Sequence, residues 1–459
     1  MNARLDPQHA QPAQQDSDLA DRGVLRFITA GSVDDGKSTL IGRLLYDTRS
    51  ILTDQLAALA RAGERRASVA ANSSHSAPTA LDLSLLTDGL EAEREQGITI
   101  DVAYRYFATA RRKFIIADTP GHEQYTRNMV TAASSADAAV ILIDATRVPG
   151  HDLLPQTRRH SALAHLLGIR HLVVAVNKMD LVDYAQPVFE RIRAAYAQLA
   201  VRLGVRAFDA IPVSALAGDN IVQAGTQMPW YQGPTLLQWL EDAPNGLDDE
   251  ADSDGAGESR LRFPVQLVLR DPNDGRGHAR RYAGRLAAGR LRAGQRIRVL
   301  PSGAAAVVSS VETFDGALDE ALAGQSVSVR LDREVDISRG DLLVADEAQG
   351  QPQVGRGFAA DLAWLDAQPL APQRRLWLRC GPRTVHARVK RIERRLDLAA
   401  LDWTADPHDT LAANDIARVA IETQHPLAFD DYDRLRATGA FVLIDPATHN
   451  TVAAGMIRS

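Results

Sequence analysis

Short, continuous apolar runs alternate with helical patterns over the first half of the chain. The helical patterns, with apolar residues at helical spacing, cover residues 38–45 and 188–203. Apolar runs bounded by polar turns are typical of parallel strands that are buried on both faces of a sheet. These runs are residues 24–30, 114–118, 138–144 and 171–177. We therefore expect an α/β domain with a mainly parallel sheet and crossover helices.

Beyond residue 260 the hydrophobic period changes from that of a helix to the alternation of a strand. Short alternating segments separated by glycine and proline turns are typical of small antiparallel barrels. The segments are residues 296–300, 326–331, 385–389 and 417–421. A break rich in glycine and glutamine at 349–357 divides this region, so we expect two β-barrels.

Composition marks the expected domain boundaries. Asp, Gly and Ser dominate residues 245–259, which is typical of a linker. Ala, Ser, Arg and Asn dominate residues 60–79, which we interpret as a mobile excursion before a helix at 81–96. The expected parts are a polar tail at 1–23, the α/β domain at 24–244, the linker at 245–259, and the barrels at 260–348 and 349–459.

Charge and composition exclude several classes of protein. Hydrophobic residues make up 45% of the 459 residues and charged residues 24%, the balance of an ordinary globular chain. A net charge of −6 gives no support for bulk nucleic-acid binding, and one cysteine, Cys380, excludes a disulfide framework. No apolar run approaches the ~20 residues of a membrane helix, and residues 1–23 lack the apolar stretch of a signal peptide. We expect a cytoplasmic protein with neither membrane nor nucleic acid as partner.

The first chemical motif follows the first expected strand and opens a helix, the context that a phosphate-binding P-loop requires. Its glycines allow backbone N–H groups to wrap phosphates, and the helix N-terminus adds a positive end. Lys37 is expected to reach the β- and γ-phosphates, and the Ser38 hydroxyl to bind Mg²⁺. The residues assigned to this loop are Gly31, Ser32, Val33, Asp34, Asp35, Gly36, Lys37, Ser38 and Thr39.

A second motif ends the strand at 114–118. Asp118 is expected to hold Mg²⁺ through water, and Gly121 to offer its backbone N–H to the γ-phosphate, because glycine permits a close approach. His122 comes directly after it, and we interpret it as positioning the attacking water, with a purely structural histidine as the alternative. The residues assigned here are Asp118, Thr119, Pro120, Gly121 and His122.

A third motif, Asn-Lys-x-Asp, follows the strand at 171–177. The Asp180 carboxylate can accept hydrogen bonds from N1–H and the 2-amino group of guanine, a pair of donors that adenine lacks. Lys178 is expected to lie along the base and brace the P-loop, and the segment 214–216 to present a backbone N–H to guanine O6. The residues assigned to the base are Asn177, Lys178, Met179, Asp180, Ser214, Ala215 and Leu216.

Two further observations favour GTP and magnesium as the ligands. Lys37 and Lys178 are two of only four lysines in an arginine-rich chain, which favours a chemical need for an ammonium group at these two positions. Thr99 closes the excursion and is expected to give its hydroxyl to Mg²⁺ and its backbone to the γ-phosphate. The expected catalytic residues are therefore Lys37, Thr99, Gly121 and His122, in an α/β P-loop GTPase domain followed by two antiparallel β-barrels.

With these motifs, the chain resembles the translation-factor family of GTPases. Within it, the chain is most similar to the large, GTP-hydrolysing subunits of bacterial sulfate adenylyltransferases, since elongation factors typically have histidine where this chain has Asp35. Two loops, at 147–155 and 271–278, depart from that pattern. The similar segments are residues 31–39, 88–106, 114–128, 156–160, 228–231, 262–266, 336–341 and 452–456.

This resemblance implies a function and a partner. GTP hydrolysis here would drive the activation of sulfate by ATP on a smaller ATP-binding catalytic subunit, in a heterodimer or a higher assembly. The resemblance leads us to expect no fused adenylylsulfate kinase. The alternatives are an elongation-factor-like GTPase that binds tRNA or the ribosome, and a stand-alone switch with protein partners. Arg158, Arg159 and His160 could contact a partner, but we expect a solvated helix face.

Overall fold

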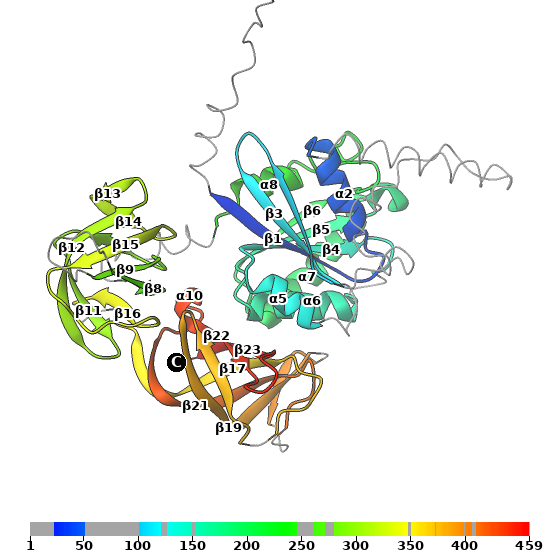
Figure 1. Ribbon diagram of the computed structural model, residues 1–459. Helices are drawn as coiled ribbons and strands as arrows, with labels where there is room; N and C mark the ends of the chain where they lie inside the picture. Colours follow the sequence, from blue (N-terminus) through cyan, green and yellow to red (C-terminus); the bar gives the residue numbers. More distant parts are fainter. Residues whose placement is uncertain are drawn as a thin grey trace, which may run out of the picture. The chain divides into compact units, whose positions relative to one another are not determined.

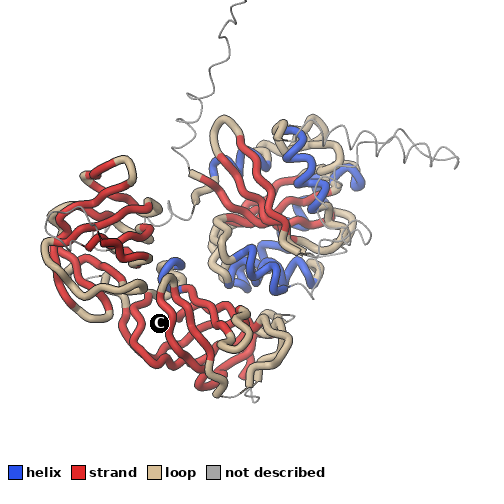
Figure 2. The backbone as a smooth tube through the Cα atoms, in the orientation of Figure 1, coloured by secondary structure: helices blue, strands red, loops and turns tan. Residues whose placement is uncertain are grey.

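The computed structural model describes residues 23–50, 101–120, 126–148, 152–245, 260–270, 280–347, 350–371, 373–398, 400–405 and 410–458. The chain divides into two compact units, Met1–Asn245 and Gly246–Ser459. Helices and strands mix in the first unit, whereas strands dominate the second (Figures 1 and 2). The helix expected at 81–96 lies outside the described residues.

A six-stranded sheet is the centre of the first unit, with strand order β2-β3-β1-β4-β5-β6. All neighbours run parallel except β2, which pairs antiparallel with β3. The mainly parallel sheet is therefore confirmed, and the antiparallel edge strand is an addition to it. The strands are β1 Val24–Ala30, β2 Ala103–Ala108, β3 Lys113–Asp118, β4 Ala138–Asp144, β5 His171–Asn177 and β6 Asp209–Pro212.

Helices cover both faces of this sheet. Apolar side chains of α2 and α8, such as Leu40 and Leu240, share one core with Phe27 and Val140 of the sheet. Helices α5, α6 and α7 lie on the opposite face (Figure 1). None of the described helices is long and apolar enough to cross a membrane. The helices are α2 Lys37–Asp47, α5 Thr126–Ala133, α6 Pro155–Leu166, α7 Gln186–Leu203 and α8 Leu236–Asp242.

The first sheet of the second unit curves into a barrel. Its strand path runs β7-β16-β11-β12-β15-β9-β8, with antiparallel pairing throughout. Strands β7 and β8 end opposite edges of this path, yet only Val265 and Gln266 separate them, so the edges must meet. The strands are β7 Phe263–Pro264, β8 Leu267–Arg270, β9 Arg280–Arg285, β11 Arg296–Leu300, β12 Ala304–Thr313, β15 Ser326–Leu331 and β16 Leu342–Ala345.

The second sheet closes directly, because β18 pairs with both β22 and β19. The ring is β18-β22-β23-β17-β21-β19, with β20 beside β19. Its interior holds fully buried side chains such as Trp364 and Leu378. The expected antiparallel barrel architecture is confirmed. The strands are β17 Gln353–Trp364, β18 Leu376–Cys380, β19 Arg383–Asp397, β20 Asp402–Ala405, β21 Ile416–Phe429, β22 Ala440–Ile444 and β23 Thr451–Arg458.

A buried ion pair joins the two barrels of the second unit. Arg262 donates through Nε and Nη2 to the two oxygens of Asp430, at 2.8 and 2.7 Å. Both side chains are 3–4% exposed, and Arg262 also donates to the carbonyl of Gly350 at 2.7 Å. A paired, hydrogen-bonded guanidinium of this kind fixes the orientation of the elements that it joins.

Candidate nucleotide-binding site

The residues of the sequence motifs gather at one edge of the six-stranded sheet. The P-loop follows β1, Asp118 ends β3, Asn177 ends β5, and Ser214 comes two residues after β6. Parallel strands bring their carboxyl ends to the same edge, where ligands of open α/β sheets bind. Residues separated by more than 180 positions in the sequence, such as Gly31 and Ser214, therefore meet in space.

The P-loop, residues 31–36, curls around the ammonium group of Lys37. Lys37 Nζ donates to the carbonyls of Gly31 at 3.1 Å and Ser32 at 2.8 Å. Burial lowers the pKa of Lys37, while the carboxylates of Asp118 and Asp35 act against that shift. Gly36 has φ +93°, and a Cβ there would lie 2.4 Å from Nδ2 of Asn177. Only glycine fits this position, for reasons of both space and backbone conformation.

Asp35 is a buried carboxylate within this loop. Its Oδ2 accepts the N–H of Ser32 at 2.5 Å, and its Oδ1 has no hydrogen-bond partner in the described part of the structure. Burial raises the pKa of Asp35 to about 6, and the nearby Asp144 adds to the shift, although Lys37 and Arg147 oppose it. Ionisation of this carboxyl group in the folded protein therefore costs more free energy than it does in water.

The carboxylate of Asp118 lies beside the start of α2. Thr29 Oγ1 donates to Asp118 Oδ1 at 3.0 Å, and Thr119 Oγ1 donates to the Thr29 carbonyl at 2.7 Å. These two bonds tie the end of β3 to the end of β1. Ser38 and Thr39 stand in the first turn of α2 and are partly exposed, and Pro120 is buried directly after Thr119.

Asn177 connects the phosphate end of the site to its base end. Its Nδ2 donates to the carbonyl of Asp35 at 2.8 Å, and its Oδ1 accepts the N–H of Ala215 at 2.9 Å. Ser214 Oγ donates to Asp180 Oδ1 at 2.6 Å, while Met179 is fully buried beneath. The side chains of the third motif and the 214–216 segment therefore form one connected group.

Lys178 is anchored at β4. Its Nζ lies 2.7 Å from Asp144 Oδ2, and its backbone adopts a left-handed conformation with φ 62°. Burial would raise the pKa of Asp144, but hydrogen bonds from Lys178 and Thr146 outweigh burial and hold that pKa below its usual range. The contact with Asp144 is one that the sequence analysis did not anticipate.

Two arginines support the site without having been singled out in the sequence. Arg147 Nη1 donates to the Val33 carbonyl of the P-loop at 2.7 Å, and Arg43 of α2 contacts the carbonyls of Ala215 and Leu216. A single arginine is not part of a recognisable sequence motif. The contact of Arg147 joins residues 114 positions apart, and those of Arg43 join residues more than 170 positions apart. The only signal was the loop at 147–155, which departs from the family pattern.

Three expected catalytic residues, Thr99, Gly121 and His122, lie outside the described residues. The expectation for His160 is wrong. Its side chain is 3% exposed rather than solvated, because it stands on the inner side of α6. Burial, with a smaller contribution from the charges of Lys37 and Arg159, lowers the pKa of His160 to about 3, so the imidazole is neutral.

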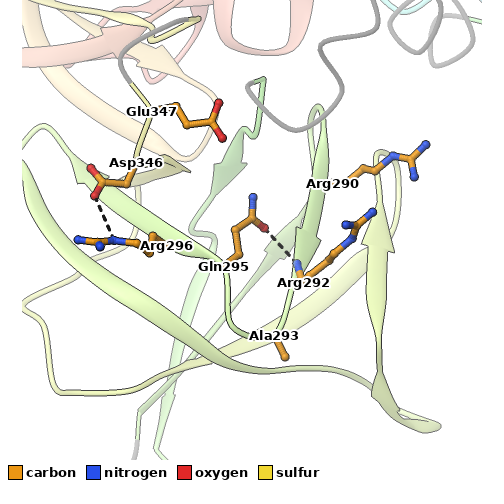
Figure 3. A pocket seen from close by; sticks show the side chains of 7 residues that line it. All are labelled: Arg290, Arg292, Ala293, Gln295, Arg296, Asp346 and Glu347. Atoms are coloured by element: carbon orange, nitrogen blue, oxygen red, sulfur yellow. Dashed lines mark hydrogen bonds and ion pairs between the residues drawn. The ribbon is translucent and has the colours of Figure 1, made fainter.

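A pocket of about 430 Å³ lies on the first barrel of the second unit (Figure 3). Its arginines have acidic neighbours: Arg292 Nε lies 2.8 Å from Glu320, and Arg296 Nε lies 3.7 Å from Asp346. None of the candidate nucleotide residues lines this pocket. Its charges largely compensate one another, which suits an ordinary charged barrel surface.

Comparison with known proteins places the chain in a family. Residues 22–245 match the Elongation factor Tu GTP binding domain, and residues 357–458 match the GTP-eEF1A C-terminal domain-like family. The chain is 47% identical over 438 residues to Sulfate adenylyltransferase subunit 1 of Laribacter hongkongensis, covering 95% of this chain and 86% of that protein. It is 49% identical over 436 residues to the protein of that name from Aeromonas salmonicida, covering 95% and 87%.

A relative with another name is longer than this chain. Bifunctional enzyme NodQ of Rhizobium meliloti is 48% identical over 436 residues, which are 95% of this chain but 64% of NodQ. The chain thus spans somewhat less than two thirds of NodQ. Identity of this level over most of subunit 1 shows that the chain belongs to the sulfate adenylyltransferase subunit 1 family, with an elongation factor Tu-type GTP-binding domain.

Proposed function

We propose that this chain is the GTP-hydrolysing subunit of a sulfate adenylyltransferase. GTP hydrolysis on this chain would drive ATP + sulfate → adenosine 5′-phosphosulfate + pyrophosphate on a smaller ATP-binding subunit in the cytoplasm. The observation that carries the proposal is the connected group from Lys37 through Asn177 to Asp180, in a chain so similar to subunit 1 proteins. Adenylyl transfer to sulfate is strongly uphill, so coupling to a second nucleotide makes thermodynamic sense.

Guanine selectivity is assigned to Asp180. Its Oδ1 accepts the hydroxyl of Ser214, which holds the carboxylate in one orientation. Each carboxylate oxygen has two lone pairs, so both oxygens remain available to accept N1–H and the 2-amino group of guanine. A base without these two donors would leave the oriented carboxylate unsatisfied, which is the source of strong discrimination.

The phosphate end is assigned to Lys37, Ser38 and Asp118. The buried ammonium of Lys37 already lies against the loop that would wrap the β- and γ-phosphates. A hydroxyl and a carboxylate are hard oxygen donors that suit Mg²⁺, which is usually held by one or two protein groups plus phosphates. Consistent with that, the described residues contain no group of three or more His, Cys, Asp or Glu side chains able to hold a metal alone. Bound Mg²⁺ would neutralise charge that develops on the phosphates.

Water activation belongs to residues outside the described part of the chain. We assign the backbone N–H of Gly121 to the γ-phosphate, His122 to the attacking water, and Thr99 to Mg²⁺ and the γ-phosphate. Lys37 stabilises the negative charge of the transferring phosphoryl group in the transition state. Ordering of the segment around Thr99 by the γ-phosphate would report the nucleotide state to the partner.

The proposal is tested by reconstituting this chain with a small ATP-binding subunit of a sulfate adenylyltransferase and measuring two rates together. Phosphate release from GTP and formation of adenosine 5′-phosphosulfate should rise together when GTP is added. His122→Ala should retain GTP binding, lower hydrolysis by about 10²–10⁴-fold, and lower GTP-driven adenylylation in proportion. Adenylylation that continues at the parent rate while hydrolysis collapses would contradict the coupling role.

The same preparation separates the proposal from an elongation-factor-like function. A translation factor would retain aminoacyl-tRNA in a GTP-dependent manner, whereas the proposed subunit should retain an ATP-binding protein. Co-purification of tRNA in place of a small ATP-binding subunit would overturn the assignment.

A further inference from the structure

Arg43 of α2 contacts the loop at 214–218, which lies more than 170 positions further along the sequence. Its Nε donates to the carbonyl of Ala215 at 3.3 Å, and its Nη2 donates to the carbonyl of Leu216. The segment 214–216 is the one assigned above to guanine O6. Helix α2 starts at the phosphate end of the site, so Arg43 connects the P-loop helix directly to the base end.

The hydrogen bonds of this loop can be accounted for group by group, because buried backbone groups are rarely left unpaired. The Ser214 carbonyl accepts Gly218 N–H at 2.8 Å, and Ala215 N–H goes to Asn177. Ala217 N–H donates to Ser214 Oγ at 3.1 Å. Arg43 takes the two remaining carbonyls. Among these groups, the N–H of Leu216 alone makes no hydrogen bond with any described residue.

That N–H and the Ala215 carbonyl belong to one peptide group. A peptide group is planar and trans, so its C=O and N–H point in opposite directions. When Arg43 holds the Ala215 carbonyl against α2, it also sets the direction of the Leu216 N–H, away from α2. The free donor of the loop is thus aimed by a side chain that does not itself touch the base.

The surroundings of Arg43 hold it in this orientation. Asp47 lies one turn further along α2, with its Oδ1 3.6 Å from Arg43 Nη1, and the guanidinium carbon lies 6.0 Å from the centre of the Tyr46 ring. Gly218, with φ +93°, turns the loop back beside the aliphatic part of the Arg43 side chain. A Cβ atom at position 218 would lie 3.6 Å from Cδ of Arg43. A cavity of about 650 Å³ opens beside these residues, so water can reach the carbonyls if the guanidinium is removed.

We infer that Arg43 is a positioning residue for guanine selectivity: it aims the Leu216 N–H at O6 of the base. Asp180 accepts hydrogen bonds from N1–H and the 2-amino group of guanine. Arg43 orients the peptide group whose N–H donates to O6. This inference rests on the proposed binding of GTP in the site.

The test compares three nucleotides on the isolated chain by equilibrium titration. 6-Thio-GTP keeps both donors for Asp180 but replaces O6 by a weak sulfur acceptor, and ITP keeps O6 but lacks the 2-amino group. Wild type should prefer GTP to 6-thio-GTP by about tenfold, the value of one good hydrogen bond. Arg43→Ala should bring that ratio close to one while the preference for GTP over ITP persists, and Arg43→Lys should keep part of the ratio.

Arg49→Ala is the matched control, because Arg49 lines the same cavity but its side chain makes no hydrogen bond or ion pair with the loop in the described part of the chain. It should leave both preferences at the wild-type values. If Arg43→Ala weakens all three nucleotides by the same factor, or changes none of them, the inference is overturned. Failure of wild type to bind GTP, or to prefer it over ITP, would instead contradict the proposed function.

Discussion

At the scale of single residues, the site is built from polar side chains that are mostly buried and are held by hydrogen bonds to defined partners. Lys37 is held by loop carbonyls, Asn177 bridges Asp35 to Ala215, and Ser214 orients Asp180. Buried polar groups of this kind are costly unless satisfied, so the network holds one geometry. That rigidity is what allows a nucleotide to be recognised by direction as well as by charge.

Asp180→Asn should exchange the base preference of the site. The side-chain amide would donate to the C2 carbonyl of xanthine and repel the N1–H and 2-amino donors of guanine, while its oxygen could still accept from Ser214. We expect GTP affinity to fall by about 100-fold or more and xanthosine triphosphate affinity to rise. Titration of both nucleotides checks this. An unchanged preference for GTP over xanthosine triphosphate would contradict the assignment of guanine recognition to Asp180.

Asp35→Asn should remove a pH dependence of stability. Burial raises the pKa of Asp35 from 3.8 to about 6, so the folded protein holds this proton more tightly than the unfolded chain. The stability that protonated Asp35 contributes is therefore present at low pH and lost as the pH rises through about 6. Between about pH 5 and pH 8, wild type should lose about 1.4 kcal/mol relative to the variant, whose amide oxygen can still accept from Ser32. Denaturant unfolding of both proteins at both pH values measures this difference. An equal change in the free energy of unfolding of wild type and variant would show that Asp35 does not titrate in this range.

At the scale of elements, the strands that the sequence predicted best are those buried on both faces. Strands β1, β4 and β5 have the bounds of the apolar runs 24–30, 138–144 and 171–177. In contrast, β19 and β21 extend well beyond their apolar alternation. Arginines of β19 pair with acidic side chains next to it: Arg388 with Glu422 of β21, and Arg395 with Asp415, the residue directly before β21. These pairs support the strand where its apolar pattern ends.

Helix α8 offers an element-scale test that leaves the site intact. The Thr235 side chain accepts Gln238 N–H at 3.2 Å, and Gln238 Oε1 accepts Thr235 N–H at 2.9 Å, a complete capping box. Thr235→Ala should lower the free energy of unfolding by about 1 kcal/mol, because it exposes unpaired N–H groups at the helix start.

Thr235→Ser is its control, since serine keeps the hydroxyl and should lose much less stability. Nucleotide affinity should be the same in both variants. Equal destabilisation by alanine and serine would mean that packing of the threonine methyl group, and not the cap, stabilises α8.

At the scale of the whole molecule, the polypeptide combines one nucleotide-binding unit with a two-barrel unit that has its own cores. Each barrel has a separate hydrophobic core, and polar contacts such as Arg262–Asp430 and Arg383–Asp341 connect the barrels. Surface ion pairs contribute little to stability, but a buried pair is different because breaking it strands a charge.

Arg262→Met should therefore destabilise the two-barrel unit by about 3–5 kcal/mol, leaving Asp430 buried without its partner. Adding Asp430→Asn should recover part of that loss, since the amide oxygen can still accept the hydroxyl that Thr438 donates to Asp430 at 2.6 Å. Calorimetry of the full chain measures both, with GTP affinity as the internal control. A double variant no more stable than the single one would show that the unpaired charge is not the cause.

The sequence by itself determined the fold class, the barrel architecture and the identity of the motif residues. Continuous apolar runs and period-two alternation are local properties, and the three motifs are written in consecutive residues, so both can be read without tertiary structure. The contacts of Arg43 and Arg147 with the site, and the pairing of Lys178 with Asp144, are determined only by the tertiary structure. Arginine and aspartate occur throughout the chain, and their contacts depend on which strand ends the sheet brings together. The burial of His160 was decided in the same way, because only packing determines which face of α6 is turned inward.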